Sequence, residues 1–111
     1  MNAQQNLTRV RGEMVVSELD GSILLSIKGL STVADWTMDK VRGLCGELRM
    51  QPHFQVLNGE WTMFFRPKQL VELLLLMAKQ EGEIPKEGQA TELVLHLSLH
   101  GYDEVMQQAF S

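Results

Sequence analysis

The chain is poor in cysteine, with Cys45 alone among 111 residues. A single cysteine rules out an intramolecular disulfide, so nothing in the sequence indicates an oxidising compartment. Long apolar runs are also missing. The longest, LLLLMA at 73–78, is far shorter than the ~20 residues that span a bilayer. Because the first twelve residues also lack the apolar core of a signal peptide, we expect a cytoplasmic protein without a membrane span.

Positive charge is scarce toward the C-terminus. Residues 1–68 hold eight Lys or Arg against seven Asp or Glu, a charge of +1, and residues 69–111 hold two against seven, a charge of −5, so the total is −4. An acidic chain is a poor general binder of nucleic acid, because phosphate attraction supplies most non-specific affinity. With 44% hydrophobic and 22% charged residues, we expect one α+β domain over 1–111, with 1–8 as a loose tail.

What is present is one pattern used twice. VVSELDGSILLSI (15–27) centres on Asp20-Gly21, and HFQVLNGEWTMFF (53–65) centres on Asn58-Gly59. Asp-Gly and Asn-Gly supply the positive φ angles of two-residue hairpin turns. We therefore predict two hairpins, with a first return strand over 22–28 and second strands over 53–57 and 60–65.

A helical stretch follows each hairpin. Ser31 or Thr32 is expected to cap the first helix, whose apolar stripe includes Val41 and Cys45 and which ends before Pro52. Pro67 suits the first position of a second helix over 67–81. The run LVLHLSLH alternates leucine with other residues, so it predicts a last strand over 92–99, followed by a short helix over 102–110.

These elements predict an α+β fold of two ββα units plus a final strand, ββα-ββα-β, closed by the short C-terminal helix. Each unit has one apolar helix stripe and one apolar sheet face, so neither is stable alone. Joining them gives one largely antiparallel five-stranded sheet with two helices packed on one face.

Candidate chemistry is weak. His96 and His100 share one face of the expected strand, but four residues of strand span about 13 Å, whereas two ligands of one zinc each lie about 2 Å from it. Only a helix would bring the pair together through its i, i+4 spacing. Ser98 has no nucleophile elbow around it, and no phosphate-binding loop is present. We expect no enzyme, no cofactor and no metal; a minimal enzyme around His53, His96 and His100 is a third alternative.

Excess apolar surface is the strongest signal. In QLVELLLLMAK (69–79) one stripe holds Leu70, Leu73, Leu74 and Met77, and a second holds Val71, Leu75 and Ala78. A helix that is apolar nearly all round needs cover on more than one side. The short C-terminal helix provides that cover if it folds back; otherwise another chain does.

The leading hypothesis is a non-enzymatic protein-binding module, such as a small cytoplasmic adaptor, inhibitor, anti-activator or chaperone, and a homodimer is expected. Its partner-binding residues are predicted to be Val71, Leu75, Ala78, His96, Ser98, His100, Tyr102, Met106 and Phe110. The alternative is a small nucleic-acid-binding transcriptional regulator, in which Arg9, Arg11, Lys40, Arg42 and Arg49 act beside the aromatic residues of the second hairpin.

Overall fold

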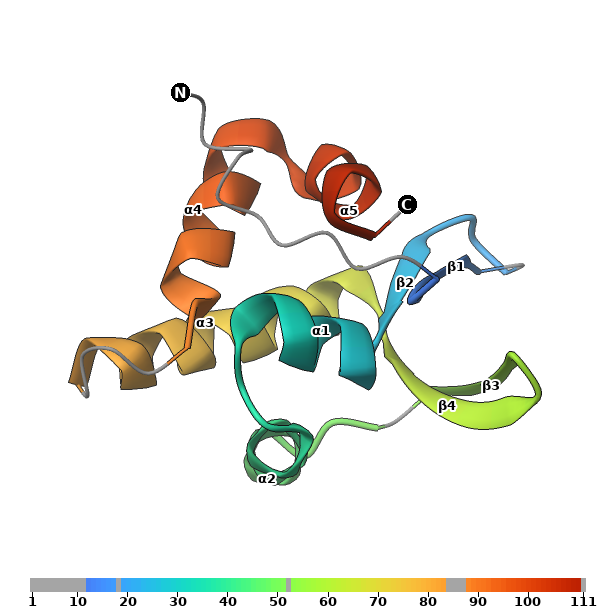
Figure 1. Ribbon diagram of the computed structural model, residues 1–111, viewed down its shortest axis with the longest axis horizontal. Coiled ribbons are helices and arrows are strands. Elements are labelled where there is room, and N and C mark those ends of the chain that lie inside the picture. The colour runs from blue at the N-terminus through green and yellow to red at the C-terminus, as the bar shows by residue number, and fades with distance from the viewer. Residues whose placement is uncertain (1–11, 18, 52, 84–87, 111) are drawn as a thin grey trace.

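Two hairpins build one four-stranded antiparallel sheet, curved into a half-barrel (Figure 1). The computed structural model describes residues 12–17, 19–51, 53–83 and 88–110. The strands are β1 (Met14–Val16), β2 (Ile23–Ser26), β3 (His53–Leu57) and β4 (Glu60–Phe65), in the order β1-β2-β4-β3. The two hairpins meet where β2 pairs with β4, so β1 and β3 are the edge strands.

The second hairpin confirms its predicted turn. Asn58 and Gly59 have φ angles of 52° and 81°, as a two-residue turn of this type requires. The first hairpin has a longer turn than predicted, because Ser17 N–H donates to Ser22 O at 2.8 Å and brackets the loop between them. Gly21 provides the positive φ within that loop.

The first return strand is shorter than predicted because a helix begins inside it. Ser26 is the N-cap of α1 (Ile27–Ala34), and its Oγ accepts from Gly29 N at 3.0 Å. The prediction of one helix capped by Ser31 or Thr32 is therefore wrong. Asp35, at φ 55°, ends α1, and Thr37 caps a separate helix, α2 (Met38–Glu47).

Three helices follow the second hairpin: α3 (Pro67–Glu83), α4 (Ala90–His100) and α5 (Tyr102–Phe110). The predicted five-stranded sheet with two helices is wrong, because the described part of the chain has four strands and five helices, and the expected strand over 92–99 is α4. Leucine is among the best helix formers, and short apolar runs do not distinguish strand from helix by periodicity alone. Leucine's helix propensity outweighs the alternation here.

A buried carboxylate fixes the start of α4. Glu81, only 8% exposed, accepts from Trp36 Nε1 at 2.7 Å, from Ala90 N at 2.6 Å and from both N and Oγ1 of Thr91 at 2.8 Å. The two backbone donors are among the N–H groups that a helix leaves without intrahelical partners. Glu81 thus supplies the N-terminal cap that the preceding residue, Gln89, does not.

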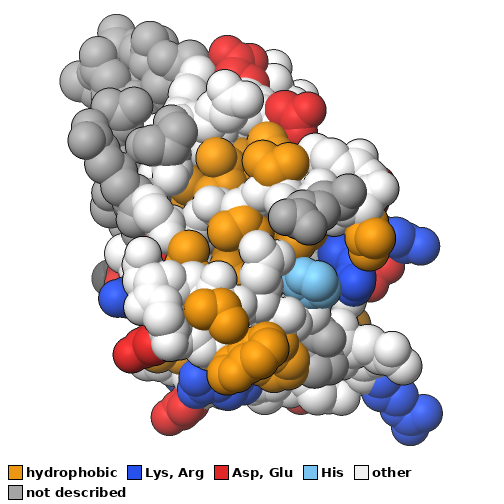
Figure 2. All heavy atoms as spheres, turned by 90° about the vertical axis from the view of Figure 1, so that its right-hand side faces the viewer, with side chains coloured by type: hydrophobic (Ala, Val, Ile, Leu, Met, Phe, Trp, Pro, Cys, Tyr) orange, Lys and Arg blue, Asp and Glu red, His pale blue; other side chains and the backbone are white. Residues whose placement is uncertain are grey.

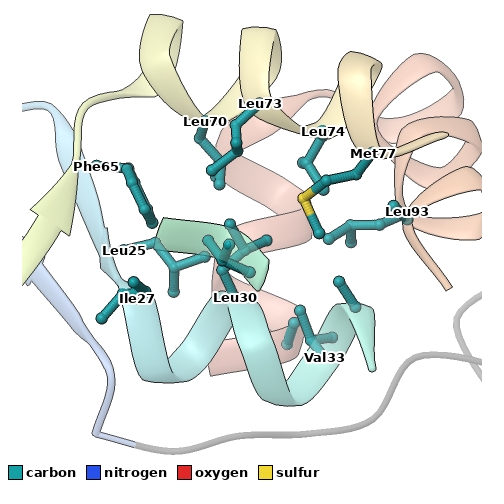
Figure 3. Close-up of a cluster of buried hydrophobic side chains, with 14 of the residues drawn as sticks. Leu25, Ile27, Leu30, Val33, Phe65, Leu70, Leu73, Leu74, Met77 and Leu93 are labelled. Carbon is teal, nitrogen blue, oxygen red and sulfur yellow. The ribbon is translucent and has the colours of Figure 1, made fainter. Parts of the chain in front are cut away.

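The main core lies between α3 and α1 (Figure 3). Leu70, Leu73, Leu74 and Met77 of α3, all fully buried, point toward α1 and the sheet. Each buried side chain of this size contributes roughly 1.5–3 kcal/mol relative to exposure. The helix α5 has the predicted bounds and folds back onto the molecule, burying Val105, Met106, Ala109 and Phe110.

Candidate functional site

An open hollow of about 800 Å³ lies between α2 and the β3–β4 hairpin. We call it the hairpin hollow. Residues of α1, of α2, of the segment joining α2 to β3 and of the hairpin itself line it. The lining residues that decide its chemistry are Arg42, Arg49, Met50, Phe54, Trp61 and Met63.

The hairpin carries an apolar face, of which Met63 packs against the core and the rest is exposed. Phe54 pairs with Met63, and Val56 pairs with Trp61. Directly opposite residues share a sheet face, so these four side chains lie together. Phe54, Val56 and Trp61 are 53%, 51% and 75% exposed, although phenylalanine and valine are usually buried and tryptophan is highly buried on average. Figure 2 views the side of the molecule on which the hairpins lie and shows apolar side chains gathered there, with both basic and acidic side chains around them.

A strained turn sets one wall of the hollow. Met50 N–H donates to Cys45 O at 3.0 Å, and Arg49 N–H donates to Gly46 O at 3.1 Å. This pair of bonds is the Schellman ending of a helix, in which glycine usually occupies the left-handed position. Here Arg49 occupies it at φ 52°, at a cost of roughly 1–2 kcal/mol for a residue with a side chain. Backbone strain of this kind clusters at functional sites.

The hollow has a mixed but slightly positive lining. Lys28, Arg42 and Arg49 contribute three cations, and Glu13 and Glu60 contribute two anions. The Arg42 guanidinium lies 3.2 Å from the carboxylate of Asp39, one turn earlier on α2. Both groups are exposed, so solvent screens this ion pair. In a chain of net charge −4, this lining favours an anionic group more than the average surface does.

Cys45 also borders the hollow. Burial raises the pKa of its thiol above the ordinary value. The thiolate is the reactive form of cysteine, so burial disfavours reaction at Cys45, whose side chain contributes apolar surface to the wall.

Four of the predicted partner-binding residues come together elsewhere. Val71, Leu75, Ser98 and Tyr102 line a second, smaller cavity of about 260 Å³ between α3 and α4, which we call the α3–α4 groove. Val71 and Leu75 are 38% and 55% exposed, so the second stripe of α3 is only partly covered by its own chain. The hydroxyl of Tyr102 donates to Ile23 O at 2.7 Å, and burial raises its pKa well above the ordinary value.

The other predicted residues lie apart from the groove lining. Ala78 and His100 are half-buried, whereas His96, Met106 and Phe110 are buried. The folded chain therefore leaves these last three almost no surface to offer.

For the nucleic-acid alternative, Arg42 and Arg49 border the hairpin hollow with Phe54 and Trp61, while Arg9 and Arg11 lie outside the described residues.

The arrangement does not assemble the histidine site considered above. His53 lies on β3, on the opposite side of the molecule from α4, which carries His96 and His100 (Figure 1). Within residues 12–17, 19–51, 53–83 and 88–110, no three His, Cys, Asp or Glu side chains are grouped to hold a metal ion.

Sequence reasoning missed the hairpin hollow, although one signal was available. Once the Asn58-Gly59 turn is accepted, the register places Phe54 and Val56 beside Trp61 and Met63. What the sequence does not show is that α1 and α2 are separate helices and that α2 stands across from this face.

Among the described helices, none has the length and apolar character to cross a membrane. Comparison with protein-family models, with curated proteins and with solved structures finds no match to this chain.

Proposed function

We propose that this chain is a non-enzymatic protein-binding module and that the hairpin hollow receives a segment of another protein. The single observation behind the proposal is Trp61, which is 75% exposed on the wall of an 800 Å³ hollow. Tryptophan is among the residues enriched at the hot spots of protein interfaces, and exposed apolar patches rimmed by polar residues mark such interfaces.

The lining indicates the chemistry of the partner segment. Phe54, Trp61 and Met63 offer apolar contacts, and methionine adapts its shape to different partners. The excess of one cation among the charged lining residues favours a segment with a carboxylate. We therefore propose a partner segment that combines bulky apolar side chains with at least one Asp or Glu.

A second candidate function is binding of single-stranded nucleic acid. Arg42 and Arg49 lie in the same lining as Phe54 and Trp61, and cations beside stacking aromatics are typical of such sites. Against this candidate, Glu13 and Glu60 belong to the same lining, and the chain carries a net charge of −4. A phosphate backbone gains little from a surface with so small a positive excess.

The test compares two exposed apolar residues. Trp61→Ser removes the proposed anchor, and Leu19→Ser is the matched control, because Leu19 is 91% exposed in the first hairpin loop and does not border the hollow. Peptides selected from a random library against the wild-type chain, and single-stranded oligonucleotides, are titrated against all three proteins by fluorescence anisotropy. Thermal unfolding verifies that both variants fold.

We expect selected peptides to contain aromatic or aliphatic residues with Asp or Glu. Trp61→Ser should weaken their binding by about 2 kcal/mol, or roughly thirtyfold in Kd, and Leu19→Ser should leave it unchanged. Equal binding by the two variants contradicts the proposal. Oligonucleotide binding that weakens steeply with salt, without any peptide binding, favours the second candidate instead.

A further inference from the structure

The strand β3 has an outer edge with unpaired backbone groups. In an antiparallel pair, opposite residues alternate between those that exchange two backbone hydrogen bonds and those that exchange none. The two-residue turn of the second hairpin makes Leu57 and Glu60 a hydrogen-bonded pair. By the same alternation Gln55 is hydrogen-bonded to β4, whereas Phe54 and Val56 are not.

The N–H and C=O groups of Phe54 and Val56 therefore point away from β4, toward the free edge of the sheet. Within the part of the chain that the structure describes, no other strand pairs with this edge. Among the same residues, no backbone hydrogen bond from a turn or loop reaches either position. Since each residue has one donor and one acceptor, this edge offers a short row of both at the spacing of a β-ladder.

The edge also lacks the usual protection against pairing. Natural sheets protect their edges with charged side chains, especially Lys, and with very short edge strands. The sequence of β3, HFQVL, contains no Lys, Arg, Asp or Glu, and its five residues exceed the three of β1, the other edge strand. Phe54 and Val56 are in addition half exposed. An exposed apolar edge strand of this kind is a template for pairing with another chain.

We propose that the partner segment binds in extended form, as a strand added to the outer edge of β3. This inference rests on the proposed function of the hairpin hollow and adds the conformation of the segment. In strand addition, main-chain hydrogen bonds provide affinity and alternate side chains provide specificity. Phe54, Trp61 and Met63 line the hollow, so every second side chain of an added strand projects on the side of the hollow.

The charges around the hollow fit the same arrangement. Arg42 and Arg49 line it from α2 and the turn that follows α2, and they complement carboxylates on the segment. We therefore expect library-selected peptides to carry apolar or acidic residues at every second position. A helical segment would instead repeat its contacts every three or four residues.

The experiment takes the tightest-binding library-selected peptide and N-methylates its backbone amides one at a time. Each methyl group removes one N–H donor and leaves every side chain in place, so each amide is the matched control for its neighbour. Binding to the wild-type chain and to Trp61→Ser is measured by fluorescence anisotropy. In an added strand, successive amides point alternately toward β3 and away from it.

We expect methylation of every second amide in the paired stretch to weaken binding about tenfold in Kd, because it leaves a C=O group of β3 unpaired. Methylation of the amides between them should change Kd little. Binding that Trp61→Ser weakens but that shows no such alternation overturns strand addition and leaves the proposed function standing. Binding that Trp61→Ser does not weaken contradicts the proposed function, and this inference falls with it.

Hydrogen exchange on the ¹⁵N-labelled chain gives a second readout. Without peptide, the amides of Phe54 and Val56 should exchange faster than those of Gln55 and Leu57, which are hydrogen-bonded to β4. Saturating peptide should slow the first pair about tenfold or more relative to the second pair. Unchanged exchange at Phe54 and Val56 with peptide bound overturns the proposal. So does protection without peptide that rises with protein concentration, because a second copy of the chain then covers the edge.

Discussion

At the scale of single residues, Glu81 connects three parts of the chain. Its carboxylate accepts from Trp36, Ala90 and Thr91 while almost fully buried. Replacing it by alanine leaves these donors without an acceptor and removes the cap of α4. A buried donor left unpaired costs roughly 1–3 kcal/mol.

We therefore expect Glu81→Ala to lower the free energy of unfolding by about 2–3 kcal/mol, measured by urea denaturation. Trp36→Phe removes only one of the four donors and should cost less. Equal stability of Glu81→Ala and the wild-type chain would show that this network does not hold α4 in place.

Tyr102 predicts a specific pH dependence. Its phenol is part-buried and donates to Ile23 O, and burial together with the nearby charge of Asp103 raises its pKa from the ordinary value of 10.0. The folded state therefore keeps the phenol protonated where the unfolded chain ionises. The stabilisation is complete below about pH 10 and is lost as the pH rises beyond that value toward the folded-state pKa.

The measurement is the free energy of unfolding against pH for the wild-type chain and Tyr102→Phe. Phenylalanine has no ionisable group, so the difference between the two proteins should shrink above about pH 10. A difference that stays constant through that range would mean that the phenol is not held in its protonated form.

At the scale of elements, the left-handed backbone at the end of α2 costs stability but places Arg49 in the lining of the hairpin hollow. Arg49 occupies the left-handed position of the Schellman turn, where glycine carries no steric penalty but loses more chain entropy on folding. We expect Arg49→Gly to raise the free energy of unfolding by about 0.5–1 kcal/mol. The same change should weaken binding of the library-selected peptides at the hairpin hollow. Stabilisation without any loss of binding would remove Arg49 from the site.

The two stripes of α3 differ in burial and should differ in response. Leu73 and Leu74 are fully buried, whereas Val71 and Leu75 are 38% and 55% exposed. Leu73→Asp and Leu74→Asp should unfold the domain, because an unpaired charge is not tolerated in the core. Val71→Asp and Leu75→Asp should stay folded and disrupt any assembly made through the α3–α4 groove.

Circular dichroism and size-exclusion chromatography with light scattering separate these outcomes. Unfolding by all four variants would contradict the two-sided description of α3. The expected homodimer remains a prediction, and identical elution of the wild-type chain and Leu75→Asp as monomers would count against it.

Local signals in the sequence predict part of the fold. The Asn58-Gly59 turn, the buried stripe of α3 and the bounds of α5 follow from turn chemistry and helical periodicity. The helix α4 did not follow, because its capping carboxylate, Glu81, lies nine residues away from Ala90. Neither did the start of α1, because its N-cap, Ser26, lies inside the stretch 22–28 that predicts a single strand.

At the scale of the whole molecule, the candidate sites depend on tertiary structure. The groove residues Val71 and Leu75 were predictable from one helix, and Ser98 joins them only because α4 packs on α3. The hairpin hollow forms because α1, α2 and the β3–β4 hairpin, which come from separate parts of the sequence, all contribute to its lining. Figure 1 shows α2 and the hairpin projecting from the same body. No local sequence pattern predicts how α2 and the hairpin are placed relative to each other, because that placement depends on the break between α1 and α2 at Asp35.

Binding of a partner segment in the hairpin hollow can be mapped by nuclear magnetic resonance, by titrating the ¹⁵N-labelled chain with a library-selected peptide and following every backbone amide. We expect the shifts to concentrate at the end of α2 and on β3 and β4, with the Trp61 indole among the largest. Shifts concentrated on α3 and α4 at Val71, Leu75 and Ser98, with the hairpin unchanged, would contradict it.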